Sequence, residues 1–118
     1  MLRRMCICKI KGGKVTEKKL YYEGSITLDK EIIEKAGLLP GEIVDVLNLN
    51  NGARISTYVI EGEKNSGVIC MNGPAARFFE IGDEIIILAV TYLGEEELKN
   101  YKMKIIELGE NNKIKSEK

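Results

Sequence analysis

The polar side chains that could do chemistry lie in four short stretches of this 118-residue chain. They comprise a lysine in the first expected strand, two glycine-containing segments, and a run of hydroxyl and cationic residues: Lys9, 22–25, 54–58 and 72–76. The chain has no histidine, the commonest general base near neutral pH. Any catalysis must therefore use a lysine, a tyrosine, a carboxylate or an unusual electrophile.

Each stretch, taken singly, also has an ordinary structural explanation. Lys9 is then a solvated strand lysine, and Arg54 a hairpin arginine that faces water. Thr57 and Tyr58 are good strand formers, and "NGP" at 72–74 is common turn chemistry. A functional interpretation therefore depends on the stretches acting together.

The pair Gly24-Ser25 is the least expected local feature. It stands directly before a strand-like run, "SITL" at 25–28, with no turn sequence between. Glycine weakens a strand because it loses the most backbone entropy and packs no side chain. Its position here needs a reason other than strand stability.

Composition limits the classes of protein that the chain can be. Its length fits one domain, and an apolar fraction of 44% is enough for a packed core. Eighteen basic residues balance eighteen acidic ones, which argues against a nucleic-acid partner. No apolar run approaches the roughly 20 residues of a membrane span, and the start has no signal-peptide pattern. We therefore expect a cytoplasmic protein with no membrane and no nucleic-acid partner.

Three cysteines, Cys6, Cys8 and Cys70, argue against a disulfide framework because their number is odd. Cys6 and Cys8 would share one face of a strand and could offer two thiolates to a metal. Without histidine, a closed zinc site would need oxygen ligands or another subunit. We favour reduced thiols packed as small hydrophobic groups, and we expect no metal ligands.

The hydrophobic pattern predicts many short strands and few helices. The expected strands are 2–10, 25–28, 43–49, 53–60, 68–71, 84–93 and 103–108. Asp29 and Gly37 should cap a helix over "KEIIEKA", and "NNG" at 50–52 should turn a hairpin. Shorter elements are a turn at 12–14, a helical turn at 15–20, small helices at 75–79 and 94–101, and a mobile polar tail over about 110–118.

A weak internal duplication adds to this picture. "LLPGEIVDVL" and "FEIGDEIIIL" both place a glycine and an acid before an alternating strand, each after a short helix. Many short strands together with this internal repeat indicate a mainly β fold, a small β-barrel with a few short helices.

The motifs "YEGS", "NNGARISTY" and "NGPAA", in this order and spacing, resemble the pyruvoyl-dependent aspartate 1-decarboxylase family. The resemblance runs from Met1 to about residue 110. It implies a double-psi β-barrel, a single decarboxylase domain over 1–118, and a homotetramer with active sites between subunits. It also implies self-cleavage between Gly24 and Ser25 into a β chain, 1–24, and an α chain, 25–118.

The resemblance gives Gly24-Ser25 a chemical reason. The Ser25 hydroxyl would attack the Gly24 carbonyl, because glycine tolerates a strained backbone that exposes this carbonyl. Ser25 would end as a covalent pyruvoyl group. The residue matching Thr57 would stabilise the oxyanion. Those matching Asn72 and Tyr22 would help to position the segment.

The resemblance also implies the reaction of the finished enzyme. The pyruvoyl group, in place of pyridoxal phosphate and without a metal, would form a Schiff base with L-aspartate and accept electrons as carbon dioxide leaves. Tyr58 would then donate the proton that yields β-alanine, a precursor of pantothenate. The choice of aspartate over glutamate rests on the resemblance alone.

Substrate binding needs cations, because aspartate has two carboxylates. Arg54 and Lys9 match the family's positions for this, and Lys9 acting from a neighbouring subunit stays open. Gly73, Pro74 and Ala75 match the turn that contacts substrate through its amides. Pro74 departs from the expected alanine and cannot donate an N–H.

Two alternatives remain from the residues. The segment "SITLDKEIIEKAGLLPGEIVDV" also resembles swapped-hairpin transcription regulators, over about a fifth of the chain. Zero net charge and the lack of an arginine cluster weigh against DNA binding. The second alternative is a barrel that has lost processing. The joint presence of the site residues disfavours it: Gly24, Ser25, Arg54, Thr57, Tyr58 and Asn72.

Overall fold

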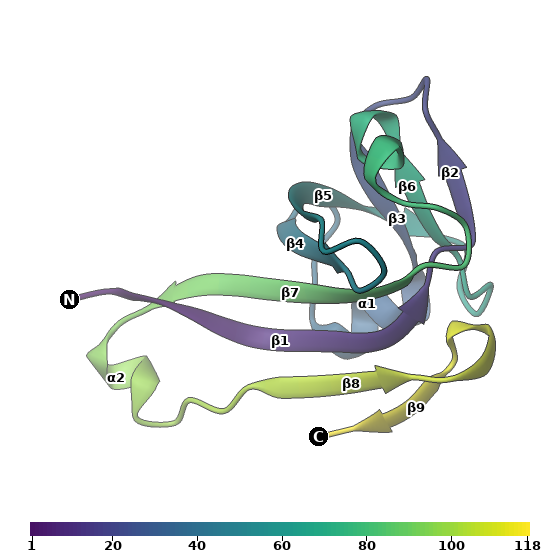
Figure 1. The fold of residues 1–118 in the computed structure, drawn as a ribbon. Helices are drawn as coiled ribbons and strands as arrows, with labels where there is room; N and C mark the ends of the chain where they lie inside the picture. The colour runs from purple at the N-terminus through teal and green to yellow at the C-terminus, as the bar shows by residue number, and fades with distance from the viewer.

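A computed structural model describes residues 1–118, which form nine strands with short helices between them (Figure 1). The strands are β1 (Arg3–Lys14), β2 (Glu17–Lys19), β3 (Ser25–Asp29), β4 (Ile43–Asn48), β5 (Arg54–Gly62), β6 (Ile69–Asn72), β7 (Glu84–Leu93), β8 (Lys104–Leu108) and β9 (Ile114–Glu117). The helices are α1 (Lys30–Ala36), α2 (Glu95–Leu98) and two 3₁₀ helices, η1 (Gly73–Phe78) and η2 (Glu110–Asn112).

The sheet closes on itself because one stretch of chain pairs at both ends. The strand order is β2-β6-β3-β5-β4-β7-β1-β8-β9, and β1 and β2 are separated by only Val15 and Thr16. The Thr16 N–H donates to the Ile69 carbonyl at 2.8 Å, and the Ile69 N–H donates to Thr16 Oγ1 at 3.0 Å. The first part of this stretch thus pairs with β7 and its continuation pairs with β6. The prediction of a mainly β, barrel-like fold is confirmed.

The core fills the inside of this barrel. Along β7 alternate side chains such as Ile85 and Ile87 are buried, and in β4 Val44 and Val46 are buried together with Asp45 between them. The short strands β3 and β6 are buried along almost their whole length. The chain therefore keeps one closed apolar interior, and β3 and β6 lie deepest in it.

Local sequence signals explain the helix and the hairpin. The Asp29 carboxylate accepts the Glu31 N–H at 2.8 Å, and Gly37 ends α1 with φ of 74°, as the capping pattern predicts. Strands β4 and β5 pair antiparallel around Gly52, whose φ is 77°. The prediction of both elements is confirmed.

Two expectations near the N-terminus are wrong. Residues 15–20 do not form a helical turn, because Glu17–Lys19 pairs with β6 as strand β2. Residues 12–14 do not form a turn either. They continue β1 through a register shift between Ile10 and Gly13, with Gly12 at φ of 84°. Sheet pairing with distant strands overrides the local pattern in both places.

The end of the chain also differs from the expected mobile tail. Residues 110–117 contain η2 and β9, and β9 pairs antiparallel with β8 (Figure 1). The Asn112 side chain is buried. Its amide donates to the carbonyls of Lys14 and Gly67, and its oxygen accepts the Lys14 N–H at 2.9 Å. This clasp ties the polar segment to the barrel.

None of the helices combines the length and apolar character that crossing a bilayer requires. Nowhere in the chain do three histidine, cysteine, aspartate or glutamate side chains gather in a metal-binding arrangement.

Candidate active site

Ser25 begins β3 and is completely buried. It lies opposite Asn72 in the antiparallel pair of β3 and β6. The Asn72 amide donates to Ser25 Oγ at 3.0 Å, and the Ser25 hydroxyl donates to the Glu23 carbonyl at 3.1 Å. The hydroxyl next to Gly24 is therefore held from two sides.

Gly73 carries the strained backbone that we expected at Gly24. Gly24 does not have a positive φ, and a Cβ added there would meet only Pro74 Cδ, at 3.5 Å. Gly73 has φ of 66°, and a Cβ on it would come within 2.5 Å of the Tyr22 carbonyl oxygen and 2.7 Å of the Gly24 nitrogen. The backbone at 22–24 thus packs directly on Gly73, which only glycine allows.

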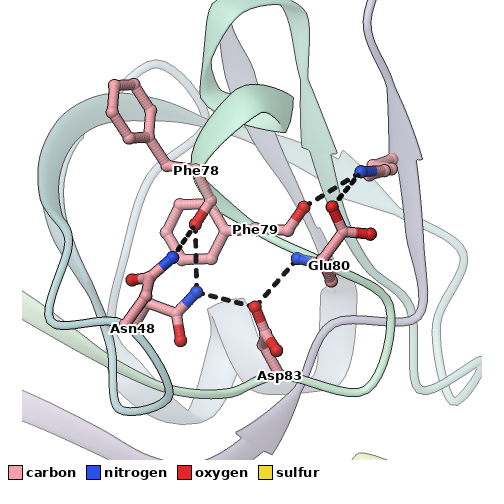
Figure 2. Close-up of polar contacts among 7 residues, drawn as sticks. Asn48, Phe78, Phe79, Glu80 and Asp83 are labelled. Atoms are coloured by element: carbon pink, nitrogen blue, oxygen red, sulfur yellow. Dashed lines mark hydrogen bonds and ion pairs between the residues drawn. The ribbon is translucent and has the colours of Figure 1, made fainter.

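A hydrogen-bond network anchors the far end of η1, the helix that starts at Gly73 (Figure 2). The amides of Asn48 and Asn51 both donate to the Phe78 carbonyl at 3.0 Å. Asn48 also donates to the Asp83 carboxylate at 2.7 Å, and the same carboxylate oxygen accepts the Glu80 N–H at 2.8 Å. These two donors, the Glu80 amide first, lower the pKa of Asp83.

On the other side of this network Lys18 of β2 donates to the Phe79 carbonyl at 3.3 Å and pairs with Glu80 at 2.9 Å (Figure 2). Strand β2 and the segment after η1 are thereby joined. The turn that carries Gly73 is consequently fixed from both directions.

Gly24 opens on a cleft of about 480 Å³, within the range of small-molecule sites. Residues from β4, β5 and η1 line the rest of this cleft: Ile43, Ile55, Ser56, Thr57, Tyr58, Pro74, Ala75 and Phe78. The structure therefore brings together Gly24, Thr57, Tyr58, Pro74 and Ala75 of the predicted site residues. Pro74 stands at the start of η1, where a missing N–H breaks no helical bond.

Tyr58 reaches toward the segment that precedes Gly24. Its hydroxyl donates to the Glu23 carboxylate at 3.4 Å, a long hydrogen bond. Desolvation, followed by the charge of Glu23, raises the pKa of Tyr58 above its usual value. The phenol therefore keeps its proton in this environment.

Arg54 begins β5 and is not among the residues that line the cleft, although it shares a strand face with Ser56 and Tyr58, which do. Its guanidinium donates to Asp45 Oδ2 at 3.3 Å, while the Ser56 hydroxyl donates to Asp45 Oδ1 at 2.6 Å. The Arg54 side chain is 56% exposed, so most of its donors face solvent. An anion could bind there without breaking the pair with Asp45.

Lys9 is the predicted site residue that stands apart. It pairs with Leu88 of β7, which pairs with Asp45, which pairs with Ser56. Three strand spacings of about 4.8 Å separate Lys9 from Ser56, about 14 Å along the sheet. Within one chain, Lys9 does not line the cleft.

Comparison with known proteins identifies the chain. A family model described as aspartate decarboxylase matches residues 1–115. The chain belongs to the aspartate decarboxylase family. The resemblance seen in the three sequence motifs is confirmed, and family membership favours an enzyme over a transcription regulator.

Named relatives in the aspartate decarboxylase family are similar over nearly their whole length. The aspartate 1-decarboxylase of Thermoanaerobacter pseudethanolicus is 54% identical over 113 residues, covering 96% of this chain and 97% of the relative. The aspartate 1-decarboxylase of Staphylococcus aureus strain JH9 is 49% identical over 114 residues, covering 97% and 90%.

The structure of this aspartate decarboxylase family member adds residues that sequence reasoning missed. Glu23 contacts both Ser25 and Tyr58, Asp45 pairs with Arg54, and Cys70 and Thr27 contact Asn72. Alternation along β6 could have placed Cys70 on the same face as Asn72. The Glu23–Ser25 contact is also local, whereas the contacts of Glu23 with Tyr58, Asp45 with Arg54, and Thr27 with Asn72 join separate segments of the chain.

Proposed function

We propose that the chain is a proenzyme that cleaves itself between Gly24 and Ser25 and then decarboxylates L-aspartate to β-alanine and carbon dioxide. β-Alanine would supply pantothenate biosynthesis. The observation that carries the proposal is the buried Ser25 hydroxyl, held by Asn72 beside a Gly24 that opens on a cleft containing Tyr58. The names of the two relatives support the same activity.

The cleavage uses atoms of this chain and water alone. Ser25 Oγ bonds to the Gly24 carbonyl carbon, the Gly24–Ser25 C–N bond breaks, and the Ser25 nitrogen takes a proton. Elimination of the resulting ester leaves a carboxylate on Gly24 and a dehydroalanine at residue 25. Addition of water and loss of ammonia then produce a pyruvoyl group at the start of the α chain.

The residues around Ser25 fit this change. Burial excludes bulk water from the hydroxyl, and a Cβ-free Gly24 leaves the approach from the cleft open. Thr57 lines the same cleft and is assigned here to stabilise the oxyanion on Gly24. Asn72 and Tyr22 are assigned to hold the segment in place, Asn72 through Ser25 Oγ and Tyr22 through its packing on Gly73.

The pyruvoyl group would accept the electrons of the bond between Cα of aspartate and its α-carboxylate as carbon dioxide leaves. A cofactor normally fills this role of electron sink. Tyr58 would hold the proton that replaces the lost carboxylate. Its raised pKa supports this role, because the phenol remains protonated near neutral pH. The backbone of Gly73 and Ala75, beside Pro74, would orient the substrate from η1.

Arg54 and Lys9 would bind the substrate carboxylates. The free donors of Arg54 support its part, whereas Lys9 lies three strands from Ser56 in one chain. In the proposed homotetramer of cleaved α and β chains, a neighbouring subunit would supply Lys9, a role that this separation favours. The three free thiols fit a reducing cytoplasmic setting, with no nucleic-acid or membrane partner.

Mass spectrometry of the purified protein tests the proposal. We expect two fragments, 1–24 and 25–118, with the larger one lighter than its sequence mass by one ammonia. The cleaved protein should release carbon dioxide from L-aspartate, and a parallel assay with L-glutamate tests the substrate choice. A chain that stays intact after long warm incubation would contradict the proposal.

A further inference from the structure

Asn72 contacts Ser25 with only one side of its amide, and the other side contacts a thiol. Cys70 lies two residues earlier on β6 and is 2% exposed. Its Sγ–H donates to Asn72 Oδ1 at 3.2 Å. Cys70 has no part in the cleavage chemistry derived above.

The nitrogen of the same amide is fully used. Asn72 Nδ2 donates to Ser25 Oγ at 3.0 Å and to Thr27 Oγ1 at 2.9 Å. Both Ser25 and Thr27 belong to β3, so the amide bridges β3 and β6 at the cleavage site. The contacts with Ser25 and Cys70 are buried and the contact with Thr27 is partly buried, and Asn72 itself is 1% exposed.

An asparagine amide can turn over, exchanging its oxygen and nitrogen at nearly no cost in shape. The hydroxyls of Ser25 and Thr27 tolerate either orientation, because a hydroxyl both donates and accepts. A thiol donates to oxygen but is a poor acceptor of N–H, so Cys70 favours the orientation with Oδ1 toward itself. Cys70 is therefore the group that turns Nδ2 toward Ser25.

The orientation matters for the nucleophile. With Nδ2 toward Ser25, the serine oxygen accepts a hydrogen bond and its proton points to the Glu23 carbonyl. With the amide reversed, the Ser25 proton would bond to Asn72 Oδ1, and the oxygen would lose the donor that holds it.

We infer that Cys70 is a positioning residue for self-cleavage: its thiol orients the Asn72 amide, with Thr27 as second anchor, so that the amide holds the Ser25 oxygen. This inference rests on the proposed function. Burial, followed by the charge of Glu17, raises the pKa of the Cys70 thiol, so the group remains a donor at neutral pH.

Cleavage kinetics of the full chain test the inference. We expect Cys70→Ala to slow the appearance of fragments 1–24 and 25–118 by about three- to tenfold, the effect of one modest buried hydrogen bond. Cys70→Ser keeps a donor at the same place, but its hydroxyl also accepts and so selects the amide orientation less strongly; it should slow cleavage less than Cys70→Ala does. Equal rates for Cys70→Ala and the wild type would overturn the inference.

An Asn72→Ala background separates positioning from packing. If Cys70 acts through Asn72, adding Cys70→Ala to Asn72→Ala causes no further slowing. The same three- to tenfold slowing in both backgrounds would mean that Cys70 only fills space, which overturns the inference.

A second measurement does not depend on cleavage. In the Ser25→Ala chain, which stays intact, side-chain amide protons of Asn72 should exchange slowly with solvent deuterium by NMR. Adding Cys70→Ala should speed this exchange about three- to tenfold, and adding Cys70→Ser should speed it less, because the hydroxyl still donates to the amide but also accepts from it. Unchanged exchange overturns the inference. An uncleaved wild type with this exchange pattern overturns the proposed function alone.

Discussion

The surroundings of Ser25 and those of Arg54 differ in burial and in how many polar partners each side chain has within one chain. Ser25 is buried, and its hydroxyl has partners on two sides. Arg54 is more than half exposed and has one carboxylate partner, while Lys9 lies three strands from Ser56. On the proposed function, the groups assigned to self-cleavage therefore meet within one chain, whereas the cations assigned to substrate binding do not.

This difference has a physical basis. A reaction within the backbone needs only a few atoms held at fixed distances, which a barrel interior does well. A substrate with two carboxylates needs cations that remain hydrated until it arrives, so they lie on the surface. Changes near Ser25 should therefore stop processing, and changes near Arg54 should leave processing intact.

The largest effect should come from Ser25→Ala, which removes the nucleophile. We expect complete loss of cleavage and no carbon dioxide release from aspartate, measured by intact mass and a carbon dioxide assay. Ser66→Ala, in the loop before β6, is the matched control and should cleave normally. Fragments from the Ser25→Ala chain would break the distinction between the two regions.

Gly73→Ala should come next, because the added Cβ would overlap the backbone at Tyr22 and Gly24. We expect loss of cleavage and a lower melting temperature. Gly52→Ala is a matched control: Gly52 also has positive φ, but nothing lies within 4 Å of its added Cβ. Backbone strain alone costs about 1–2 kcal/mol. Equal losses for both variants would show that strain, and not the contact with Gly24, matters.

Tyr58→Phe should leave cleavage intact but reduce kcat by about a hundred- to ten-thousandfold, as expected for loss of a general acid. Steady-state decarboxylation rates on fully cleaved protein measure this. Tyr21→Phe, at a tyrosine that is 96% exposed, should have no effect. If Tyr58→Phe also slowed cleavage, Tyr58 would take part in self-cleavage as well as in decarboxylation, and the two functions would not be separate.

Arg54→Ala should raise KM for aspartate by about ten- to a hundredfold, the loss expected for charge-assisted hydrogen bonds. Cleavage should proceed at the wild-type rate, since Arg54 does not line the cleft at Gly24. Arg77→Ala, which removes an exposed arginine of η1, is the control. An unchanged KM would assign carboxylate binding to other residues.

The smallest effect should come from Asp83→Asn in the network behind η1. The folded protein lowers the pKa of Asp83 below its ordinary 3.8, so its ionised form stabilises the fold above that pH. This contribution is lost as the pH falls through the lowered pKa. Thermal melting should therefore show a small gap between wild type and Asp83→Asn at neutral pH that closes on acidification. A gap that persists in acid would assign the effect to packing.

Sequence reasoning worked where contacts are short in range. Asp29 and Gly37 capped α1 as expected, and "NNG" turned the β4–β5 hairpin. The first part of β7 follows its alternating pattern, with Ile85, Ile87 and Ala89 buried. It failed at 15–20 and at the C-terminus, where pairing of β2 with β6 and β9 with β8 decides the structure.

Within the candidate site, the same division holds. The pair Gly24-Ser25 can be recognised from the sequence, because the chemistry proposed for it concerns a single peptide bond. Asn72 acts on Ser25 from 47 residues away, and Gly73 packs on Gly24 across the β3–β6 pair. Motif resemblance suggested Asn72, but only the pairing of β3 with β6 brings Asn72 and Cys70 beside Ser25 and Thr27.

Residue order alone thus predicts the proposed cleavage position, the capped helix, the β4–β5 hairpin and the cations proposed to bind a dicarboxylate. These properties depend on neighbours a few positions apart. Barrel closure through Thr16, the overlap that forbids a side chain at Gly73, and the distance of Lys9 from the cleft depend on strands that meet only after folding. Long-range pairing positions these groups, and the tertiary structure was needed to find them.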